Sequence, residues 1–203
     1  MSIALIGATG RAGSRILAEL VQRGQTVTAI VRHPEKVAPS ANVTAVSGDV
    51  KNGEALAELL KGHDAVISAV HFNDTDLPVL ISAVKTSGVP RWLVVGGAGS
   101  LFVAPGKQLV DQPDFPEAYR TEAGKGRDFL NLLKAEEDVD WTFISPSALI
   151  FEGERTGTYR LGGDDLLIGA DGKSQISFED FAVALVDELE NAAHPRQRIT
   201  AGY

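Results

Sequence analysis

The chain opens with Ser2-Ile3-Ala4-Leu5-Ile6-Gly7-Ala8-Thr9-Gly10-Arg11-Ala12-Gly13, the stretch that decides the fold. An apolar run of strand length meets three glycines spaced by three, and a helix-like pattern follows at once. Glycine permits a tight turn, and it lets the backbone approach a pyrophosphate because no Cβ stands in the way. Free N–H groups and the dipole at the helix start then attract phosphate charge. This order of strand, glycine-rich turn and helix predicts a dinucleotide-binding site.

The composition is that of an ordinary globular chain, and the net charge disfavours some classes of binding partner. The 203 residues are 44% hydrophobic and 23% charged, and no apolar run approaches the roughly 20 residues of a membrane helix. The net charge of −8 disfavours nucleic acids and anionic membranes, because repulsion opposes both kinds of binding. The chain has no cysteine, which excludes disulfides and thiolate catalysis. The first apolar run lacks the basic flank of a signal peptide, so we expect a cytoplasmic protein.

Apolar runs of strand length alternate with helical patterns along the chain. Strands are predicted at the opening run and at 27–31, 43–46, 65–70, 92–95 and 141–144. Helices are predicted at 15–23, 54–61, 77–85, 117–136 and 178–191, the last with Ser177 as its N-cap. This alternation predicts an α/β fold, a doubly wound Rossmann-type parallel sheet in a single domain, 1–203. Within it, 151–203 are expected to form a small C-terminal elaboration on the substrate side.

Two segments interrupt the alternation. Residues 96–116 follow the fifth predicted strand, are rich in glycine and proline, and predict a long functional loop. Residues 151–174 are also rich in glycine. Within them, 158–161 and 166–169 are expected to pair as a hairpin around the turn 162–165.

The residues at the strand ends indicate the cofactor, because ligands of parallel sheets bind at the carboxyl ends of strands. The second predicted strand ends at Arg32, where an NAD site usually carries an acid that binds the ribose 2′-hydroxyl, and no acid occurs before Glu35. A guanidinium suits the 2′-phosphate of NADP(H) through charge-assisted hydrogen bonds. Arg11, within the glycine turn, is expected to reach the same phosphate. We therefore favour NADP(H); the alternative is that Arg32 is a solvated surface arginine.

Five motifs follow one another along the chain: Gly7-Ala8-Thr9-Gly10-Arg11-Ala12-Gly13, Val31-Arg32, Gly48-Asp49-Val50, Gly96-Gly97-Ala98-Gly99-Ser100 and Ser145-Pro146-Ser147. Together they resemble the atypical short-chain dehydrogenase/reductase proteins. The likeness is greatest to the NAD(P)H-binding group that includes flavin and biliverdin reductases and NmrA-like proteins, and it continues through 176–182. The glycine motif is specific for this superfamily but not for one reaction.

The resemblance assigns roles that the residues alone do not indicate. It implies that Asp49, by itself an ordinary loop or cap residue, holds the adenine together with Val50. It also implies that Ala69 and Val70 line the adenosine ribose and the pyrophosphate. The remaining roles lie at the nicotinamide, with Gly97 and Ser100 near it and Pro146 and Ser147 closing over it.

Most of the superfamily uses a Tyr-x-x-x-Lys pair on the helix after the fifth strand, where the tyrosine exchanges a proton and the lysine holds the ribose. Tyr119 lies in the right interval, but Ala123 stands where the lysine belongs. Lys125 is two residues further on, about 200° around a helix from that position. It substitutes for the missing lysine only if the helix is irregular, which Glu122, Gly124 and Gly126 make possible.

Two other residues are candidates for the chemistry. Ser100 and the apolar residues 101–103 after it suit a lid over the nicotinamide, although Ser100 also suits a plain turn cap. His71 follows the fourth predicted strand into the same region, where a histidine can donate a proton near neutral pH or merely occupy a loop. The four histidines are scattered without ligand spacing, so no metal site is expected.

Three functions are compatible with these observations. The favoured one is an NADPH-dependent reductase that transfers hydride to a small conjugated acceptor such as a flavin or quinone, with solvent or a side chain supplying the proton. The second is a non-catalytic NADP(H)-binding sensor of the NmrA-like kind, which the missing lysine favours. A sugar-nucleotide epimerase is least favoured, because such enzymes need the tyrosine–lysine pair and a larger C-terminal domain. Either a monomer or a homodimer is expected.

Overall fold

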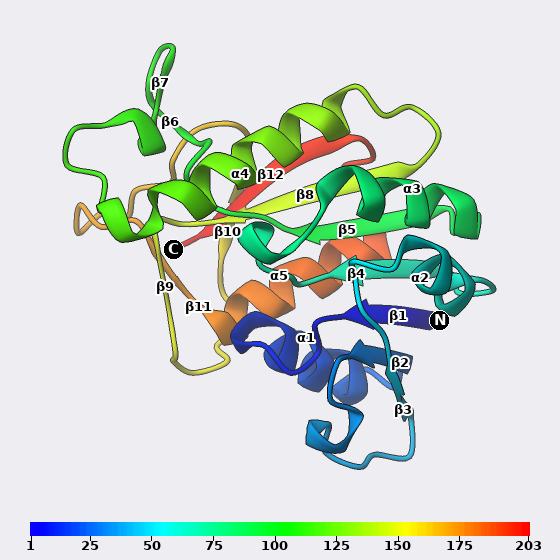
Figure 1. The fold of residues 1–203 in the computed structure, drawn as a ribbon. Coiled ribbons are helices and arrows are strands. Elements are labelled where there is room, and N and C mark those ends of the chain that lie inside the picture. The colour runs from blue at the N-terminus through cyan, green and yellow to red at the C-terminus, as the bar shows by residue number, and fades with distance from the viewer.

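The computed structural model describes all residues from 1 to 203, and its centre is one eight-stranded sheet (Figure 1). The strand order across the sheet is β10-β12-β8-β5-β4-β1-β2-β3. The strands are β1 (Ser2–Ile6), β2 (Thr26–Val31), β3 (Val43–Ser47), β4 (Ala65–Ser68), β5 (Arg91–Val95), β8 (Asp140–Pro146), β10 (Arg160–Gly162) and β12 (Gln197–Gly202). All of them run parallel except β10, which is antiparallel to β12.

Five helices cover the two faces of this sheet: α1 (Arg11–Gln22), α2 (Gly53–Leu60), α3 (Leu77–Ser87), α4 (Glu117–Lys134) and α5 (Phe178–Asn191). On one face α1 and α5 bury Leu20 and Leu185, and on the other face α4 buries Phe129 beside α2 and α3. This confirms the predicted doubly wound, Rossmann-type fold. None of the helices is both long and apolar enough to cross a lipid bilayer.

Local signals explain where several elements begin and end. The hydroxyl of Ser177 accepts the N–H of Asp180 at 3.0 Å, which confirms it as the N-cap of α5. Gly24 follows α1 with φ +73°, a left-handed conformation that ends a helix without a Cβ penalty. The helix α4 is continuous from its first residue to its last, so the irregularity that would bring Lys125 to the position of Ala123 is absent.

The C-terminal part differs from the expectation in two ways. β10 pairs with β12, Arg160 opposite Gly202, and does not form a hairpin with 166–169, whose Leu166 donates its N–H to Phe102 O. The patterns above also do not predict β12. As a result, α5 and β12 belong to the central layers, and the elaboration outside those layers is confined to the chain between β8 and α5. There β9 (Leu149–Phe151) pairs in parallel with β11 (Gln175–Ser177).

The long segment 96–116 is ordered by its own contacts. It contains the short antiparallel pair β6 (Phe102–Ala104) and β7 (Lys107–Gln108), followed by the 3-10 turn η3 (Leu109–Asp111). Leu101 and Val110 are buried, and Arg120 of α4 donates to the carbonyl oxygens of Val110 and Phe115 at 2.7 and 3.0 Å. Because α4 holds this loop in place, the loop forms a fixed wall at the carboxyl end of β5.

Candidate functional site

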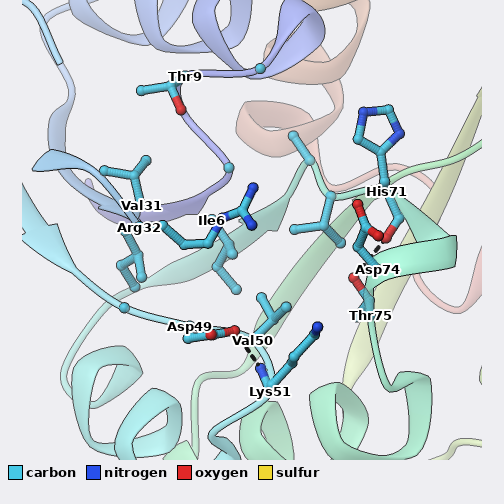
Figure 2. A pocket seen from close by; sticks show the side chains of 16 residues that line it. Ile6, Thr9, Val31, Arg32, Asp49, Val50, Lys51, His71, Asp74 and Thr75 are labelled. Carbon is cyan, nitrogen blue, oxygen red and sulfur yellow. Dashed lines mark hydrogen bonds between the residues drawn. The ribbon is translucent and has the colours of Figure 1, made fainter. Parts of the chain in front are cut away.

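A cavity of about 440 Å³ opens at the carboxyl ends of β1, β2, β3 and β4 (Figure 2). β1 and β4 are neighbours in the sheet, and the strand order reverses between them, which is where doubly wound folds bind ligands. Predicted cofactor residues that line the cavity are Gly7, Thr9, Gly10, Arg32, Asp49, Val50, Ala69 and Val70, together with the predicted catalytic residue His71. Four chain segments far apart in sequence therefore meet at one site.

Two of the three motif glycines are required by close packing. Gly7 has φ +84°, and a Cβ on it would overlap the carbonyl oxygen of Ala69. A Cβ on Gly13 would overlap the carbonyl oxygen of Gly7, so any side chain here would push α1 off the turn. Gly10 differs, because its Cβ would come no closer than 3.4 Å to any protein atom. The protein's own packing does not require glycine at position 10, whereas a phosphate close to this backbone would.

The start of α1 is suited to bind an anion. Gly10 is the N-cap and offers no side-chain oxygen, and the first turn carries no acidic residue. The N–H of Ser14 bonds to Gly10 O at 2.9 Å, so the amides of the three residues before Ser14 have no acceptor within the helix. Ala12 packs against the core on the same turn. These amides and the helix dipole together would hold a pyrophosphate.

Arg32 extends from the end of β2 into the middle of the cavity, between Thr9 and Asp49 (Figure 2). Its guanidinium forms no ion pair, and the nearest acid in sequence, Glu35, lies 3.2 Å from His33 instead. Lys51 lines the same cavity and also lacks an acidic partner, a feature that the sequence reasoning missed. Two unpaired cations in one cavity of a chain with net charge −8 favour an anionic ligand.

Arg11 does not lie where the sequence placed it. Its guanidinium lies 4.7 Å from the ring centroid of Phe178, and its Nε is 3.8 Å from the carboxylate of Glu152. These cation–π and ionic contacts draw the side chain toward the start of α5, and Arg11 does not line the cavity. The expectation that Arg11 shares a phosphate with Arg32 is therefore corrected.

Asp49 accepts hydrogen bonds from the backbone of the turn that follows it. Its Oδ1 accepts the N–H of Lys51 at 2.9 Å, and its carbonyl oxygen accepts the N–H of Asn52 at 3.0 Å. This fixes the backbone of Asp49 and Val50 along the cavity wall, beneath Arg32 in Figure 2. The arrangement leaves Oδ2 of Asp49 and the Val50 side chain available to a planar base.

The tyrosine–lysine pair is absent. Tyr119 lies in the first turn of α4 with 66% of its surface exposed, and it does not line the cavity. Ala123 packs against Gly99, where a Cβ on the glycine would come within 2.7 Å of the alanine Cβ. This contact requires glycine at position 99 and holds α4 against the loop after β5. Lys125 instead donates to Asn73 O at 3.3 Å.

The predicted nicotinamide residues are separate from the cavity. Ser100 is buried, and Ser147 is buried with its hydroxyl 3.3 Å from Ala201 O. Pro146 ends β8 opposite Ala201, so it and Ser147 join β8 to β12. Gly97 has no atom within 4 Å of a Cβ placed on it, which leaves open space in front of the loop that follows β5.

His71 and Glu122 meet at the cavity rim, and the sequence reasoning missed this role of Glu122. The carboxylate accepts the N–H groups of Phe72 and Asn73 at 2.7 and 2.8 Å, at the start of the 3-10 turn η2 (Phe72–Asp74). Its Oε1 lies 3.6 Å from Nδ1 of His71. Thr75 and Asp74, also missed, line the cavity beside His71. No short-range signal pairs Glu122 with a turn 50 residues earlier.

Comparisons with known proteins agree with this geometry. A family model for NAD(P)H-binding proteins matches residues 7–192. YwnB, an uncharacterized protein of Bacillus subtilis strain 168, is 41% identical over 210 residues, covering 98% of this chain and 97% of that protein. A crystal structure of a proposed epimerase from Bacteroides thetaiotaomicron is 45% identical with a TM-score of 0.95, over 100% of this chain and 96% of that one. A proposed NADH-flavin reductase from Streptococcus pneumoniae TIGR4 is 38% identical with a TM-score of 0.84, over 100% and 99% of the two chains. The chain belongs to the NAD(P)H-binding family.

Proposed function

We propose that this protein is an NADPH-dependent reductase that transfers hydride to a small conjugated acceptor such as a flavin or a quinone. At the coarser level, the chain is an NAD(P)H-binding oxidoreductase. The relative from Streptococcus pneumoniae, described as an NADH-flavin reductase, supports the acceptor class. The choice of NADPH over NADH is argued from this chain's own cavity.

The observation that carries the proposal is the unpaired guanidinium of Arg32 inside the cavity. An acid at this place would bind the ribose 2′-hydroxyl of NADH and repel a 2′-phosphate. A guanidinium instead donates charge-assisted hydrogen bonds to the phosphate. With the adenosine at Arg32 and Asp49 and the pyrophosphate at Gly10, the nicotinamide would extend toward the open space at Gly97.

NADPH supplies the hydride when it is bound. The residues of the chain bind the cofactor, orient the acceptor beside it and shield the reaction from water. Gly97 leaves room beside the nicotinamide position, and the buried Leu101 fixes the loop that bounds this space. Direct hydride transfer to a conjugated acceptor does not need a tyrosine–lysine pair to exchange the proton, which fits this site, where the pair is absent. The same absence argues against an epimerase, the description given to the relative from Bacteroides thetaiotaomicron.

The first experiment follows absorbance of the nicotinamide while the purified protein is mixed with NADPH and either FMN, a quinone or dichloroindophenol. We expect oxidation of NADPH that depends on both protein and acceptor. Tight NADPH binding without turnover on any acceptor would reject the reductase and support a sensor, the function that Ala123 favours.

The second experiment tests the cofactor choice with Arg32→Ala. Removing the charge-assisted hydrogen bonds should weaken NADPH binding by about 1.5–3 kcal/mol and leave NADH binding unchanged. Isothermal titration calorimetry measures both. Lys134→Ala, which removes an exposed cation at the far end of α4, is the control and should change neither affinity. An equal loss for NADPH and NADH would contradict the 2′-phosphate contact.

A further inference from the structure

α4 contacts two walls of the site within one turn. Glu122 binds the N–H groups of Phe72 and Asn73, while the next residue, Ala123, packs against Gly99. The start of η2 and the loop after β5 are therefore neighbours along α4. Gly126, one helical turn further on, has its missing Cβ against the ring of Phe72, which locks the same turn to the helix.

His71 lies at this junction. It lines the cavity on the side away from Asp49 (Figure 2), so it faces the end that a dinucleotide reaches after its adenosine and pyrophosphate. Its side chain is 84% exposed, which lets the ring exchange protons with water. Its carbonyl oxygen accepts the hydroxyl of Thr75 at 2.7 Å, so the turn that follows holds the backbone that carries the ring.

Glu122 faces the ring at Nδ1, with 3.6 Å between that nitrogen and Oε1. The other charged groups around this turn are Asp74, which also lines the cavity, and Lys125, whose ammonium binds Asn73 O. A carboxylate beside Nδ1 holds a proton on that nitrogen, so Nε2 is the ring nitrogen left to pass a proton to another molecule. The carboxylate is itself fixed by two backbone N–H groups, so it can hold the ring's orientation.

We propose that His71 donates the proton to the acceptor reduced at this site, and that Glu122 is the positioning residue that orients it. The inference rests on the proposed reductase function. The acceptor takes a hydride, two electrons and one proton, from the nicotinamide. It takes a second proton from Nε2 of His71 in its imidazolium form, and the neutral ring that remains keeps its proton on Nδ1, facing Glu122. NADPH is thereby oxidised to NADP⁺, the acceptor gains two hydrogens, and His71 recovers its proton from water.

The test compares His71→Gly, Glu122→Gln and the double variant, with dichloroindophenol and FMN as acceptors. His71→Gly should lower kcat by about 100-fold, the usual contribution of a general acid, and leave the dissociation constant for NADPH unchanged. Free imidazole, which can fill the vacated space, should restore part of the kcat of His71→Gly. Imidazole should have no such effect on wild-type protein.

Glu122→Gln should lower kcat by roughly tenfold, and its loss should disappear in the His71→Gly background. A purely structural role in capping η2 would give the same loss in both backgrounds. The control Glu117→Gln changes an exposed carboxylate on the same helix that pairs only with Arg120, and it should leave kcat unchanged. Thermal melting checks that each variant is folded.

The outcomes separate the two proposals. Wild-type protein that binds NADPH but reduces neither acceptor overturns the reductase and the role of His71 together. Wild-type turnover with an unchanged kcat in His71→Gly overturns only the proton donor. A fall in kcat of His71→Gly that imidazole does not reverse also overturns the proton donor. Additive losses in the double variant overturn the pairing of His71 with Glu122.

Discussion

Two groups of cations in this protein differ in their partners. At the cavity, Arg32 and Lys51 form no ion pair with any carboxylate of the chain, although Asp49 lines the same space. In the layer of α1, α5 and the C-terminal strands, arginines are paired with carboxylates, as in Arg155 with Glu19, Arg23 with Asp187, Arg91 with Glu188 and Arg198 with Asp164. The paired cations join segments far apart in the sequence, whereas the unpaired ones join nothing within the chain.

The paired charges stabilise the fold, whereas the unpaired charges at the cavity are available to a ligand. A buried carboxylate with several donors cannot be removed without leaving a cation unpaired in a desolvated place. An exposed cation at a cavity mouth costs the fold little, because water solvates it. Stability should therefore respond to changes in the first group, and ligand affinity to changes in the second.

The largest effect is expected from Glu188→Ala. Glu188 is buried and accepts hydrogen bonds from Arg91 at 2.7 Å and from the backbone and ring of His194 at 3.0 and 2.7 Å. Burial already lowers the pKa of Arg91, and the variant would leave its guanidinium unpaired. We expect a loss of about 3–5 kcal/mol in the free energy of unfolding, measured by urea denaturation.

Arg32→Ala provides the other half of this comparison, because its unfolding free energy should stay within about 0.5 kcal/mol of wild type. Glu188→Gln keeps the shape and should lose less than Glu188→Ala. A Glu188→Ala protein as stable as wild type would break the distinction between the two groups of charges.

Two glycines of the first turn show the same difference between stability and ligand affinity, with smaller expected effects. Gly13→Ala places a Cβ onto the carbonyl oxygen of Gly7 and should cost about 1–3 kcal/mol of stability through overpacking. Gly10→Ala meets no protein atom within 3.4 Å, so its stability should be close to wild type while its affinity for NADPH falls. Denaturation and calorimetry on the two variants measure the two effects. Equal losses of stability would show that Gly10 is required by the fold.

The smallest effect on the free energy of unfolding is expected when the pH is lowered. The guanidinium of Arg155 lowers the pKa of Glu19 against the opposing effect of burial. Burial alone would raise the pKa of Asp180, but hydrogen bonds from Thr156, Tyr203 and Gly157 outweigh it and lower the value. A carboxylate whose pKa is lower folded than unfolded stabilises the fold above the unfolded pKa, and this contribution is lost as the pH falls through the folded pKa.

Stability should therefore decline below about pH 4.5, the ordinary pKa of glutamate. Urea denaturation of wild type and Glu19→Gln across this range is the measurement, and the variant should show the shallower decline. Glu137→Gln, an exposed change, is the control and should follow the wild-type curve. A steeper decline in Glu19→Gln than in wild type would reverse the sign of the argument.

The sequence predicted the layers of the fold because each element carries its own local signal. The β-branched run 27–31 and the N-cap Ser177 both act within a few residues of themselves. β12 was missed because its polar residues find partners only across the fold, as when Thr200 donates its hydroxyl to Gly163 O at 2.7 Å. The hairpin was predicted wrongly for the same reason, since β12 offers β10 a ladder that local sequence does not reveal.

The site also contains residues that the local sequence predicts and contacts that depend on distant parts of the chain. Arg32, Asp49 and Val70 were placed together because the carboxyl ends of parallel strands meet at one edge. The direction of Arg11 depends on Phe178 and Glu152, which lie far along the chain. The meeting of Glu122 with η2 likewise depends on how α4 docks. Which residues end a strand can be predicted locally, but where a long side chain points cannot.

The position of β12 has a consequence for how the chain folds during synthesis. It leaves the ribosome after β8 and β10, yet it lies between them in the sheet. Until β12 emerges, β8 ends the sheet with unpaired N–H and C=O groups, and β10 has no strand to join. The half that contains the cavity can form first, because none of its strand pairs involves β12. A nascent chain of this protein would thus build its cavity before it closes its far edge.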